Sequence, residues 1–211
     1  MNSLRVKICG INSEAAFDAA IEAGADWVGF VFFPPSPRFV TPARAAQLSL
    51  RHPGGPPRVG LFVAPTEADI GTALAALPLD ILQIYAPPER AAEWRRRFGR
   101  PVWRAVGVAG PDDLPGTAEG ADAFLIEAKA PEDATRPGGN AISFEWSVLA
   151  GWHAPAPWLL AGGLNPENVA RAIAETHTSA VDVSSGVESE PGVKDPALIR
   201  DFVAAARGAA G

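Results

Sequence analysis

Short apolar runs alternate with amphipathic, alanine-rich runs along the whole chain, and eight such pairs can be counted. This alternation is typical of βα units that build a parallel sheet. The apolar runs predict strands at 5–9, 27–32, 58–63, 81–85, 102–108, 123–128, 158–161 and 180–184. The amphipathic runs predict helices at 13–23, 42–50, 66–76, 88–98, 112–118, 144–150, 166–175 and 195–207.

Polar residues that favour helix N-termini precede five of the expected helices. They are Ser13, Thr41, Thr66, Asn165 and Asp195. Their side-chain oxygens can accept a hydrogen bond from an unpaired N–H of the first turn. A proline follows Thr41, Asn165 and Asp195, and its fixed φ suits the first helical position.

Three segments are expected to be less regular. The run at 112–118 is rich in Pro, Gly and Asp, so the fifth helix is expected to be a single turn. Residues 131–141 predict a long, mobile loop after the sixth strand. The alanine-rich end at 204–211 is expected to fray.

Chain length favours a closed barrel over an open sheet. Eight βα units in 211 residues match a small (β/α)8 barrel, whereas a doubly wound sheet of this length would usually have fewer strands. Apolar residues make up 47% of the chain, which is enough to bury one sizeable core. We therefore expect a single (β/α)8-barrel domain spanning 1–211.

Composition narrows the class of partner. The formal net charge of −6 argues against a nucleic-acid surface, since phosphate backbones are bound by clustered cations, so we expect a small-molecule partner. The single cysteine excludes a disulfide framework, and the three histidines lack ligand-like spacing, so no metal is expected. No signal-peptide or membrane-spanning run is visible, and a cytoplasmic location without membrane contact is expected.

Functional side chains of such barrels lie at the C-terminal ends of the strands. The candidates at these positions are Cys9, Arg38, Tyr85, Glu127 and Ser184. Side chains alternate between the two faces of a strand, and this alternation predicts that Cys9 and Glu127 point into the mouth of the barrel.

Lys7 and Asp182 are predicted to form an ion pair inside the barrel. Alternation turns Lys7 inward below Cys9, and Asp182 turns inward on the last strand, which closes against the first. We expect the charge of Lys7 to favour the thiolate of Cys9. The apolar neighbours of Glu127 should raise its pKa, which suits a general acid.

Each candidate also has a plainer explanation. Cys9 could be a small buried hydrophobic residue, which is the commoner situation for a lone cysteine. Glu127 could be a surface carboxylate, and Arg38 could be a solvated loop residue. The prolines around Arg38 favour a stiff loop that holds its guanidinium as a clamp for a carboxylate.

Two loops are predicted to bind phosphate. Gly162 and Gly163 follow the seventh strand and precede an expected helix, while Ser184, Ser185 and Gly186 follow the eighth strand. Both loops present backbone N–H groups. Barrels often bind phosphate between these two loops, although a single glycine pair is more often only a turn.

Several motifs resemble those of the phosphoribosylanthranilate isomerase family of tryptophan biosynthesis, and the match runs almost end to end. They are VKICGI at 6–11, GAD at 24–26, GFVF at 29–32, SPR at 36–38, VGLFV at 59–63, AGGLNPEN at 161–168 and VDVSSGVE at 181–188. The resemblance implies a (β/α)8 barrel that carries out an Amadori rearrangement. It also implies that no metal or organic cofactor is needed, because the substrate's own amine accepts the electrons.

The resemblance also implies a role for each candidate. Glu127 would be the general acid that protonates the ribose ring oxygen of N-(5'-phosphoribosyl)anthranilate and opens the ring to a Schiff base. Cys9 would be the general base that removes the C2′ proton, which leads to 1-(2-carboxyphenylamino)-1-deoxyribulose 5-phosphate. Arg38 would bind the anthranilate carboxylate, and Asp182 would contact the sugar hydroxyls or only balance Lys7. The glycine and serine loops would hold the phosphate.

Three positions depart from the family pattern. The acid is usually an aspartate, and Glu127 is one methylene longer. The fourth strand commonly ends in Gln-Leu-His-Gly, whereas 83–86 reads QIYA, so that Tyr85 could donate a hydrogen bond in place of a histidine. Ala141 stands where the family loop usually has glycine. These departures leave open a sugar-phosphate-binding barrel with weak or repurposed activity.

Other classes of protein fit the sequence less well. An epimerase barrel would be expected to bring metal-ligating histidines and carboxylates, and a ring-closing synthase a lysine-rich mouth. A protein-interaction domain would need an exposed aromatic stripe, but the tryptophans fall within expected elements or at their edges. We expect a monomer, with a dimer as the alternative.

Overall fold

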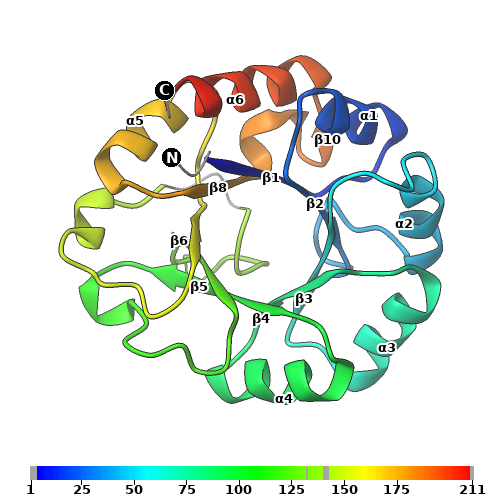
Figure 1. Cartoon of the computed structure of the whole chain (residues 1–211), viewed down its shortest axis with the longest axis horizontal. Helices are drawn as coiled ribbons and strands as arrows, with labels where there is room; N and C mark the ends of the chain where they lie inside the picture. Colours follow the sequence, from blue (N-terminus) through cyan, green and yellow to red (C-terminus); the bar gives the residue numbers. More distant parts are fainter. Residues whose placement is uncertain (1–3, 132, 140–142, 210–211) are drawn as a thin grey trace.

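The computed structural model describes residues 4–131, 133–139 and 143–209. Eight parallel strands pair in chain order and close into a barrel through β8 and β1 (Figure 1). They are β1 (Arg5–Cys9), β2 (Trp27–Val31), β3 (Arg58–Val63), β4 (Ile81–Tyr85), β5 (Val102–Val108), β6 (Ala123–Ala128), β7 (Trp158–Leu160) and β8 (Ala180–Val183). The predicted (β/α)8 barrel is confirmed, and every strand ends within one residue of its expected bounds.

Helices on the outside of the barrel connect most of the strands (Figure 1). Those in the described part of the chain are α1 (Glu14–Glu22), α2 (Pro42–Ser49), α3 (Glu67–Ala76), α4 (Pro88–Phe98), α5 (Val169–Thr176) and α6 (Pro196–Gly208). A single turn, η1 (Pro111–Asp113), stands at the fifth position as expected.

The helix expected at 144–150 is wrong, because only the 3₁₀ turn η2 (Trp146–Leu149) forms there. Trp146 and Leu149 are both buried. Side chains three residues apart align in a 3₁₀ turn, so a single turn is enough to bring both of them to the core.

Four of the five expected helix caps are confirmed. The confirmed caps, whose side chains accept a hydrogen bond from the first turn, are Ser13, Thr41, Thr66 and Asp195. The expectation for Asn165 is wrong, because α5 begins at Val169. The Asn165 side chain instead accepts from the N–H groups of Glu167 and Asn168, which stabilises a turn ahead of the helix.

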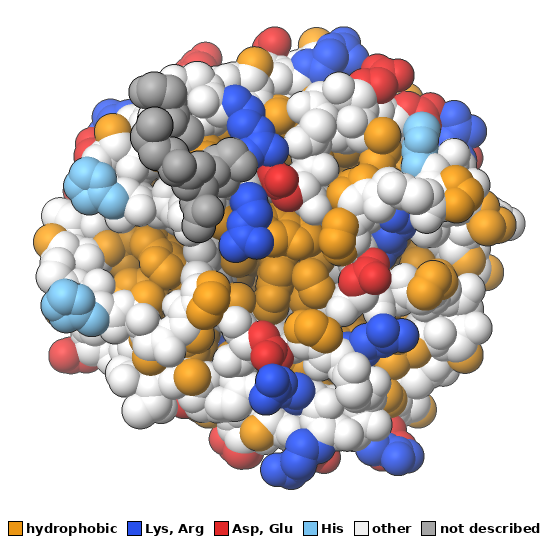
Figure 2. Space-filling model, in the orientation of Figure 1, with side chains coloured by type: hydrophobic (Ala, Val, Ile, Leu, Met, Phe, Trp, Pro, Cys, Tyr) orange, Lys and Arg blue, Asp and Glu red, His pale blue; other side chains and the backbone are white. Residues whose placement is uncertain are grey.

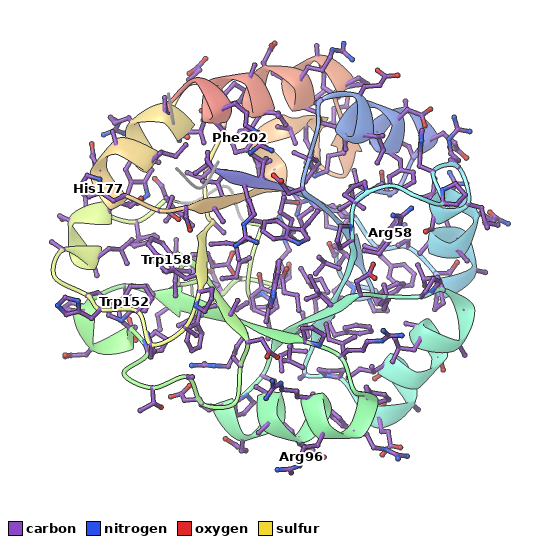
Figure 3. All side chains as sticks on the ribbon, in the orientation of Figure 1. Arg58, Arg96, Trp152, Trp158, His177 and Phe202 are labelled. Atoms are coloured by element: carbon purple, nitrogen blue, oxygen red, sulfur yellow. The ribbon has the colours of Figure 1, made fainter. Side chains whose placement is uncertain are left out.

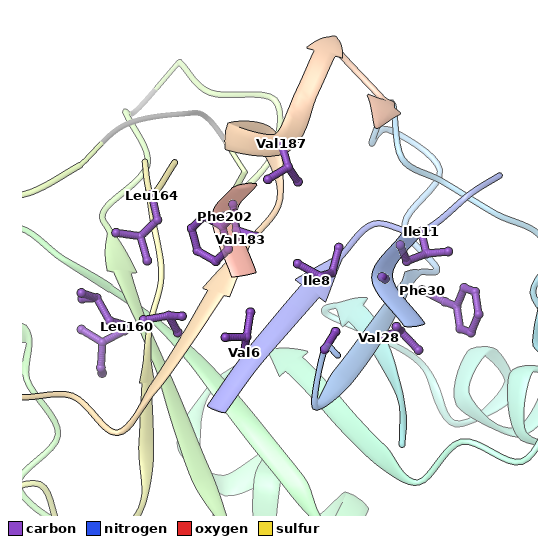
Figure 4. Close-up of a cluster of buried hydrophobic side chains, with 14 of the residues drawn as sticks. Val6, Ile8, Ile11, Val28, Phe30, Leu160, Leu164, Val183, Val187 and Phe202 are labelled. Carbon is purple, nitrogen blue, oxygen red and sulfur yellow. The ribbon is translucent and has the colours of Figure 1, made fainter. Parts of the chain in front are cut away.

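The main core lies between the barrel and its helices. Val6 and Ile8 point outward from β1, as alternation predicts, and belong to one apolar cluster with Phe202 of α6 (Figure 4). Inside the barrel, a second cluster fills the end where the strands begin, and there Trp27 and Trp103 meet edge to face with ring centroids 5.1 Å apart. Among the described residues, this packing fills the end of the interior where the strands begin, and the interior opens toward their C-terminal ends.

The periphery combines aromatic packing with a charged rim. Trp152 and Trp158 lie side by side with centroids 5.5 Å apart, and Arg96 of α4 points away from the barrel (Figure 3). Seen down the barrel, apolar side chains gather at the centre of the face and charged ones occupy much of its edge (Figure 2). No helix among the described residues is long and apolar enough to cross a membrane.

The fraying expected at 204–211 is wrong as far as Gly208, where α6 ends. The last turns of α6 remain helical because they bury Val203 and Ala206 against the core. Residues 210–211 lie outside the described part of the chain.

A short hairpin that the sequence did not predict follows β8. After the turn η3 (Ser185–Val187), β9 (Glu188–Glu190) pairs antiparallel with β10 (Val193–Lys194). Gly192 in its turn has a φ of 85°, and a side chain there would collide with the carbonyl of Pro37. The hairpin therefore packs closely against the loop that follows β2.

Candidate active site

A pocket opens at the C-terminal end of the barrel and brings together most of the predicted site residues. Apolar side chains such as Val31, Phe33 and Leu61 line it together with a few charged and polar groups, which suits a small-molecule ligand. The predicted residues that line it are Cys9, Arg38, Tyr85, Glu127, Gly162, Gly163, Asp182, Ser184 and Ser185. Gly186 lies behind this lining, against the loop that follows β7.

The predicted ion pair between Lys7 and Asp182 is confirmed. The two residues are partners in the register of β1 and β8, and Lys7 Nζ lies 2.7 Å from Asp182 Oδ1 with both side chains buried. Burial lowers the pKa of Lys7, but the charge of Asp182, the hydrogen bond to Asp182 and the interaction with Cys9 together outweigh burial, and the pKa is raised. Lys7 therefore stays protonated beneath the pocket.

Cys9 is the last residue of β1 and is 3% exposed. Gly29 on β2 makes room for it, since a Cβ there would lie 3.0 Å from the Cys9 Sγ. Burial raises the pKa of the thiol more than the charge of Lys7 lowers it, and Asp182 adds a further rise. The charge of Lys7 does favour the thiolate, as expected, but burial outweighs this effect and the thiol remains the more stable form.

Glu127 reaches the same pocket from β6 and is 4% exposed. Burial raises its pKa to about 8, although a hydrogen bond from Tyr85 acts in the opposite direction. The predicted rise is confirmed. Its Oε1 has no hydrogen-bond partner among the described residues. The carboxyl group is thus protonated at neutral pH, with one oxygen available to a ligand.

Arg38 is buried, and a protein carboxylate holds its guanidinium. Glu188 accepts from Nε at 2.7 Å and from Nη2 at 2.8 Å, while Nη1 donates to the carbonyl of Gly139 at 3.2 Å. Gly10, with a φ of 79°, allows this placement, since a Cβ there would lie 2.9 Å from the Arg38 Cδ. The guanidinium is fixed, as expected, but Glu188 contributes as well as the stiff loop.

Glu188 and Lys194 were not among the predicted site residues. Lys194 Nζ donates to Glu188 Oε1 at 2.7 Å and to the Ser184 carbonyl at 2.8 Å. Burial lowers the pKa of Lys194 to about 8. Burial raises the pKa of Glu188, but bonds from Arg38 and Lys194 outweigh it and bring the value to about 2. Glu188 was only part of a family motif, and no other signal in the sequence pointed to this network.

Gln83 on β4 is a further pocket residue that the sequence did not single out. Its side chain is fully buried, and neither its amide oxygen nor its amide nitrogen has a partner among the described residues. An unpaired buried amide is costly, and such groups are usually satisfied by a ligand or a bound water. The available signal was its strand position: Gln83 lies two residues before Tyr85 and therefore points to the same, inward face of β4.

The two predicted phosphate loops lie against one another. Gly162 and Gly163 have φ values of 82° and 65°, which glycine adopts far more easily than other residues. Gly186 has no room for a side chain beside the carbonyl of Leu164. Because α5 begins at Val169, the glycine pair precedes a short turn and not the helix itself.

The loop after β6 closes one side of the pocket. Its residues 136–139 contribute to the lining, whereas Ala141 lies outside the described residues, and the mobility of the loop stays a prediction. Within 4–131, 133–139 and 143–209, no three His, Cys, Asp or Glu side chains group together as metal ligands.

Comparison with known proteins adds to this geometry. A family model described as N-(5'phosphoribosyl)anthranilate (PRA) isomerase matches residues 6–205. The chain belongs to this family. A member named N-(5'-phosphoribosyl)anthranilate isomerase from Acidiphilium cryptum is 58% identical over 205 residues, covering 97% of this chain and 99% of the relative. The protein of the same name from Paracoccus denitrificans is 53% identical and covers 97% of each chain.

Solved structures of family members have the same fold. Phosphoribosyl anthranilate isomerase from Thermotoga maritima superposes with a TM-score of 0.84 at 37% identity, covering 97% of this chain and 99% of the other. A second solved isomerase, in complex with reduced 1-(o-carboxyphenylamino)-1-deoxyribulose 5-phosphate, gives a TM-score of 0.81 at 35% identity, with the same coverage. These likenesses support the isomerase interpretation and not the alternative of a repurposed barrel.

Proposed function

We propose that this chain converts N-(5'-phosphoribosyl)anthranilate into 1-(2-carboxyphenylamino)-1-deoxyribulose 5-phosphate, a step of tryptophan biosynthesis. The observation that carries the proposal is one pocket lined by Cys9, by Glu127 and by the two loops that follow β7 and β8. A buried thiol and a protonated carboxyl group beside an anion-binding loop pair suit acid–base chemistry on a sugar phosphate.

Glu127 is the general acid in this mechanism. With a pKa of about 8 it holds a proton at neutral pH, and it donates this proton to the ribose ring oxygen. The bond between C1′ and the ring oxygen breaks as the anthranilate nitrogen shares its lone pair with C1′. The product of this step is an open-chain protonated Schiff base and an ionised Glu127.

Cys9 is the general base in the second step. Its thiolate takes the proton from C2′, and the electron pair of that C–H bond forms a double bond between C1′ and C2′. The iminium electrons return to nitrogen, which gives an enolamine. Loss of the C2′ hydroxyl proton and protonation at C1′ complete the ketone, so that the atoms of substrate and product balance. No cofactor is required, because the protonated nitrogen accepts the electron pair.

The active form of the pair carries one proton, on Glu127, with Cys9 ionised. Burial raises both pKa values, and the thiol, which is ordinarily the weaker acid of the two, remains the weaker acid. The active form is therefore the less populated of the two singly protonated forms. The positive charges of Lys7 and Lys194 lower the pKa of the thiol and so increase the population of the active form, in which Cys9 is ionised.

The remaining residues of the pocket bind the substrate. Arg38 binds the anthranilate carboxylate through its guanidinium, and Asp182 contacts the sugar hydroxyls. The phosphate is held by the loops containing Gly162, Gly163, Ser184, Ser185 and Gly186, whose backbone N–H groups suit an anion. The unpaired amide of Gln83 provides both a donor and an acceptor on the pocket wall.

The organisation of the protein in the cell completes the proposal. We infer a single domain over 1–211 that is monomeric, cytoplasmic, and independent of nucleic acid and membrane. A dimer is the competing state, because one similar solved structure is of monomers generated from the dimeric isomerase of Thermotoga maritima. Sedimentation equilibrium of the purified chain distinguishes the two states.

The central test follows the fluorescence decay of freshly made phosphoribosylanthranilate. We expect turnover by the wild type and a loss of about 100-fold or more in Cys9→Ser and in Glu127→Gln. Glu22→Gln, which neutralises an exposed carboxylate on α1, is the matched control and should keep wild-type turnover. Undiminished turnover in both pocket variants would rule out the acid–base assignment, and an inactive wild type would favour the repurposed barrel.

A further inference from the structure

The Tyr85 hydroxyl and the Glu127 carboxyl group lie close together in the pocket wall, beside Gly138. A Cβ built on Gly138 would lie 2.6 and 2.7 Å from the two carboxylate oxygens of Glu127, and closer still to the Tyr85 hydroxyl. The hydroxyl group and both carboxylate oxygens therefore converge on the same backbone atom. Gly138 leaves space for them only because it has no side chain.

The ring of Tyr85 is fixed by apolar packing on two sides. It packs against the cluster of Cys9, Val31 and Leu61 near the mouth, and also against the deeper cluster that contains Leu125. Its hydroxyl therefore has a defined position. Burial, followed by the charge of Glu127, raises the pKa of Tyr85 well above its usual value, so the hydroxyl stays a neutral donor.

Glu127 needs such a support more than a shorter acid would. A glutamate side chain has one rotatable bond more than aspartate, and placement within about half an ångström decides the efficiency of a proton transfer. The Tyr85 hydroxyl and the Glu127 carboxyl group converge beside Gly138, and Tyr85 opposes the rise that burial causes in the pKa of Glu127. Oε1 has no hydrogen-bond partner among the described residues. The carboxyl group thus lies beside the hydroxyl, and Oε1 is left for the substrate.

We propose that Tyr85 is the positioning residue of the general acid, which anchors one carboxyl oxygen of Glu127 and directs Oε1 toward the substrate. The proposal rests on the proposed function, because it assumes that Glu127 delivers the proton. Tyr85 and Glu127 act as a unit in which the bulk of the tyrosine is matched to the length of the glutamate.

Removal of the Tyr85 hydroxyl should change the pH dependence of the reaction in a defined direction. A hydrogen bond to the ionised carboxylate lowers the pKa of Glu127, so Tyr85→Phe should raise it. The other groups that face Glu127 are Lys7 and Asp182 from the strands, and the Gly139 N–H from the loop, and none of them is altered by this variant. The rise of kcat/KM near pH 8 should move upward by about one pH unit.

The first experiment compares pH profiles of Tyr85→Phe and Val63→Ala with the wild type. Val63 lines the pocket next to Tyr85 in the strand register but carries no polar group. We expect Tyr85→Phe to lower kcat by about 10-fold or more with little change in KM, and to shift the profile. Val63→Ala should leave the midpoint of the profile in place. An unshifted midpoint in Tyr85→Phe overturns the proposal.

The second experiment is a double-mutant cycle between Tyr85→Phe and Glu127→Asp. Aspartate withdraws the carboxyl group by one methylene, so the Tyr85 hydroxyl should no longer reach it. We expect the loss caused by Tyr85→Phe to shrink to less than about 2-fold in the aspartate background. Equal losses in both backgrounds overturn the proposal. If Glu127→Gln keeps wild-type turnover, both the acid role of Glu127 and the Tyr85 proposal are overturned. If Glu127→Gln is inactive but the losses caused by Tyr85→Phe and Glu127→Asp simply add, the Tyr85 proposal alone is overturned.

Discussion

At the level of single residues, Cys9 and Glu127 have pKa values raised by burial, and these values set the pH at which the pair works. We expect kcat/KM to rise with pH through about 8, because the fully protonated pair must first lose one proton. It should fall again above the raised pKa of the thiol, when the second proton is lost. Steady-state rates from about pH 6 to 10.5 check this, and a flat profile around pH 8 would contradict it.

The buried pair of Lys7 and Asp182 gives a prediction about stability. Lys7→Met leaves Asp182 charged and unpaired, so we expect a loss of about 3–5 kcal/mol in the free energy of unfolding, measured with urea. The double variant Lys7→Met/Asp182→Leu should recover part of this loss, because apolar packing can replace a buried pair. Arg171→Met, in the exposed pair with Glu175, is the control and should change stability little. If Lys7→Met and Arg171→Met lowered the free energy of unfolding equally, the prediction would be contradicted.

The Lys7–Asp182 ion pair and the pKa of Cys9 differ in how far the sequence predicts them. The pairing of Lys7 with Asp182 was predictable, because strand alternation and closure of β8 onto β1 are enough to bring the two together. The pKa of Cys9 was not, because it depends on the balance between depth of burial and a charge that is already compensated. Depth is a property of the packed barrel and cannot be read from residue order.

At the level of elements, the hairpin of β9 and β10 supports the proposed carboxylate clamp. Glu188→Gln keeps the shape of the side chain but removes the charge between Arg38 and Lys194. We expect KM for phosphoribosylanthranilate to rise by about 10-fold, with a smaller change in kcat, because Arg38 is no longer firmly held. Glu190→Gln, on the exposed side of the same hairpin, is the matched control. If both variants show the same KM, the hairpin does not support Arg38.

The strands, the hairpin and the segment 144–150 differed in how well the local sequence predicted their structure. The eight strands were predictable because each is a continuous apolar run between turn residues. The hairpin was missed because its strands have only three and two residues, too few to show a pattern. Its turn also packs against Pro37, which is far away in the chain. The helix expected at 144–150 shortened to one turn because two buried side chains already satisfy the core there.

For the molecule as a whole, the protonated Glu127 makes stability depend on pH. Its pKa is about 8 in the folded chain and 4.5 without burial, so the folded state holds a proton that the unfolded state releases between these values. Its contribution to stability is therefore full below about pH 4.5 and is lost as the pH rises through 8. Glu127→Gln should flatten the pH dependence of the free energy of unfolding, as measured by urea denaturation at several pH values. An unchanged dependence would contradict the burial of a neutral carboxyl group.

The architecture and the location of the site followed from the sequence, but the full wall of the pocket did not. Eight βα units and the chain length predicted the barrel, and the strand ends predicted where Cys9 and Glu127 lie. The network of Glu188 and Lys194 arises from a turn and a hairpin whose packing is set by the finished fold. The unpaired amide of Gln83 likewise becomes apparent only when its surroundings are known.

The ion pairs across the seam of the barrel also bear on how the protein is made. Lys7 and Asp182 are separated by 175 positions, and Arg38 and Glu188 by 150. While the ribosome is still translating the middle of the message, β1 lacks β8, its second neighbour, and the counter-charge of Asp182. Contacts between such distant segments slow folding. The nascent chain therefore carries uncompensated cations until its last quarter emerges, and the enzyme can be completed only at the end of synthesis.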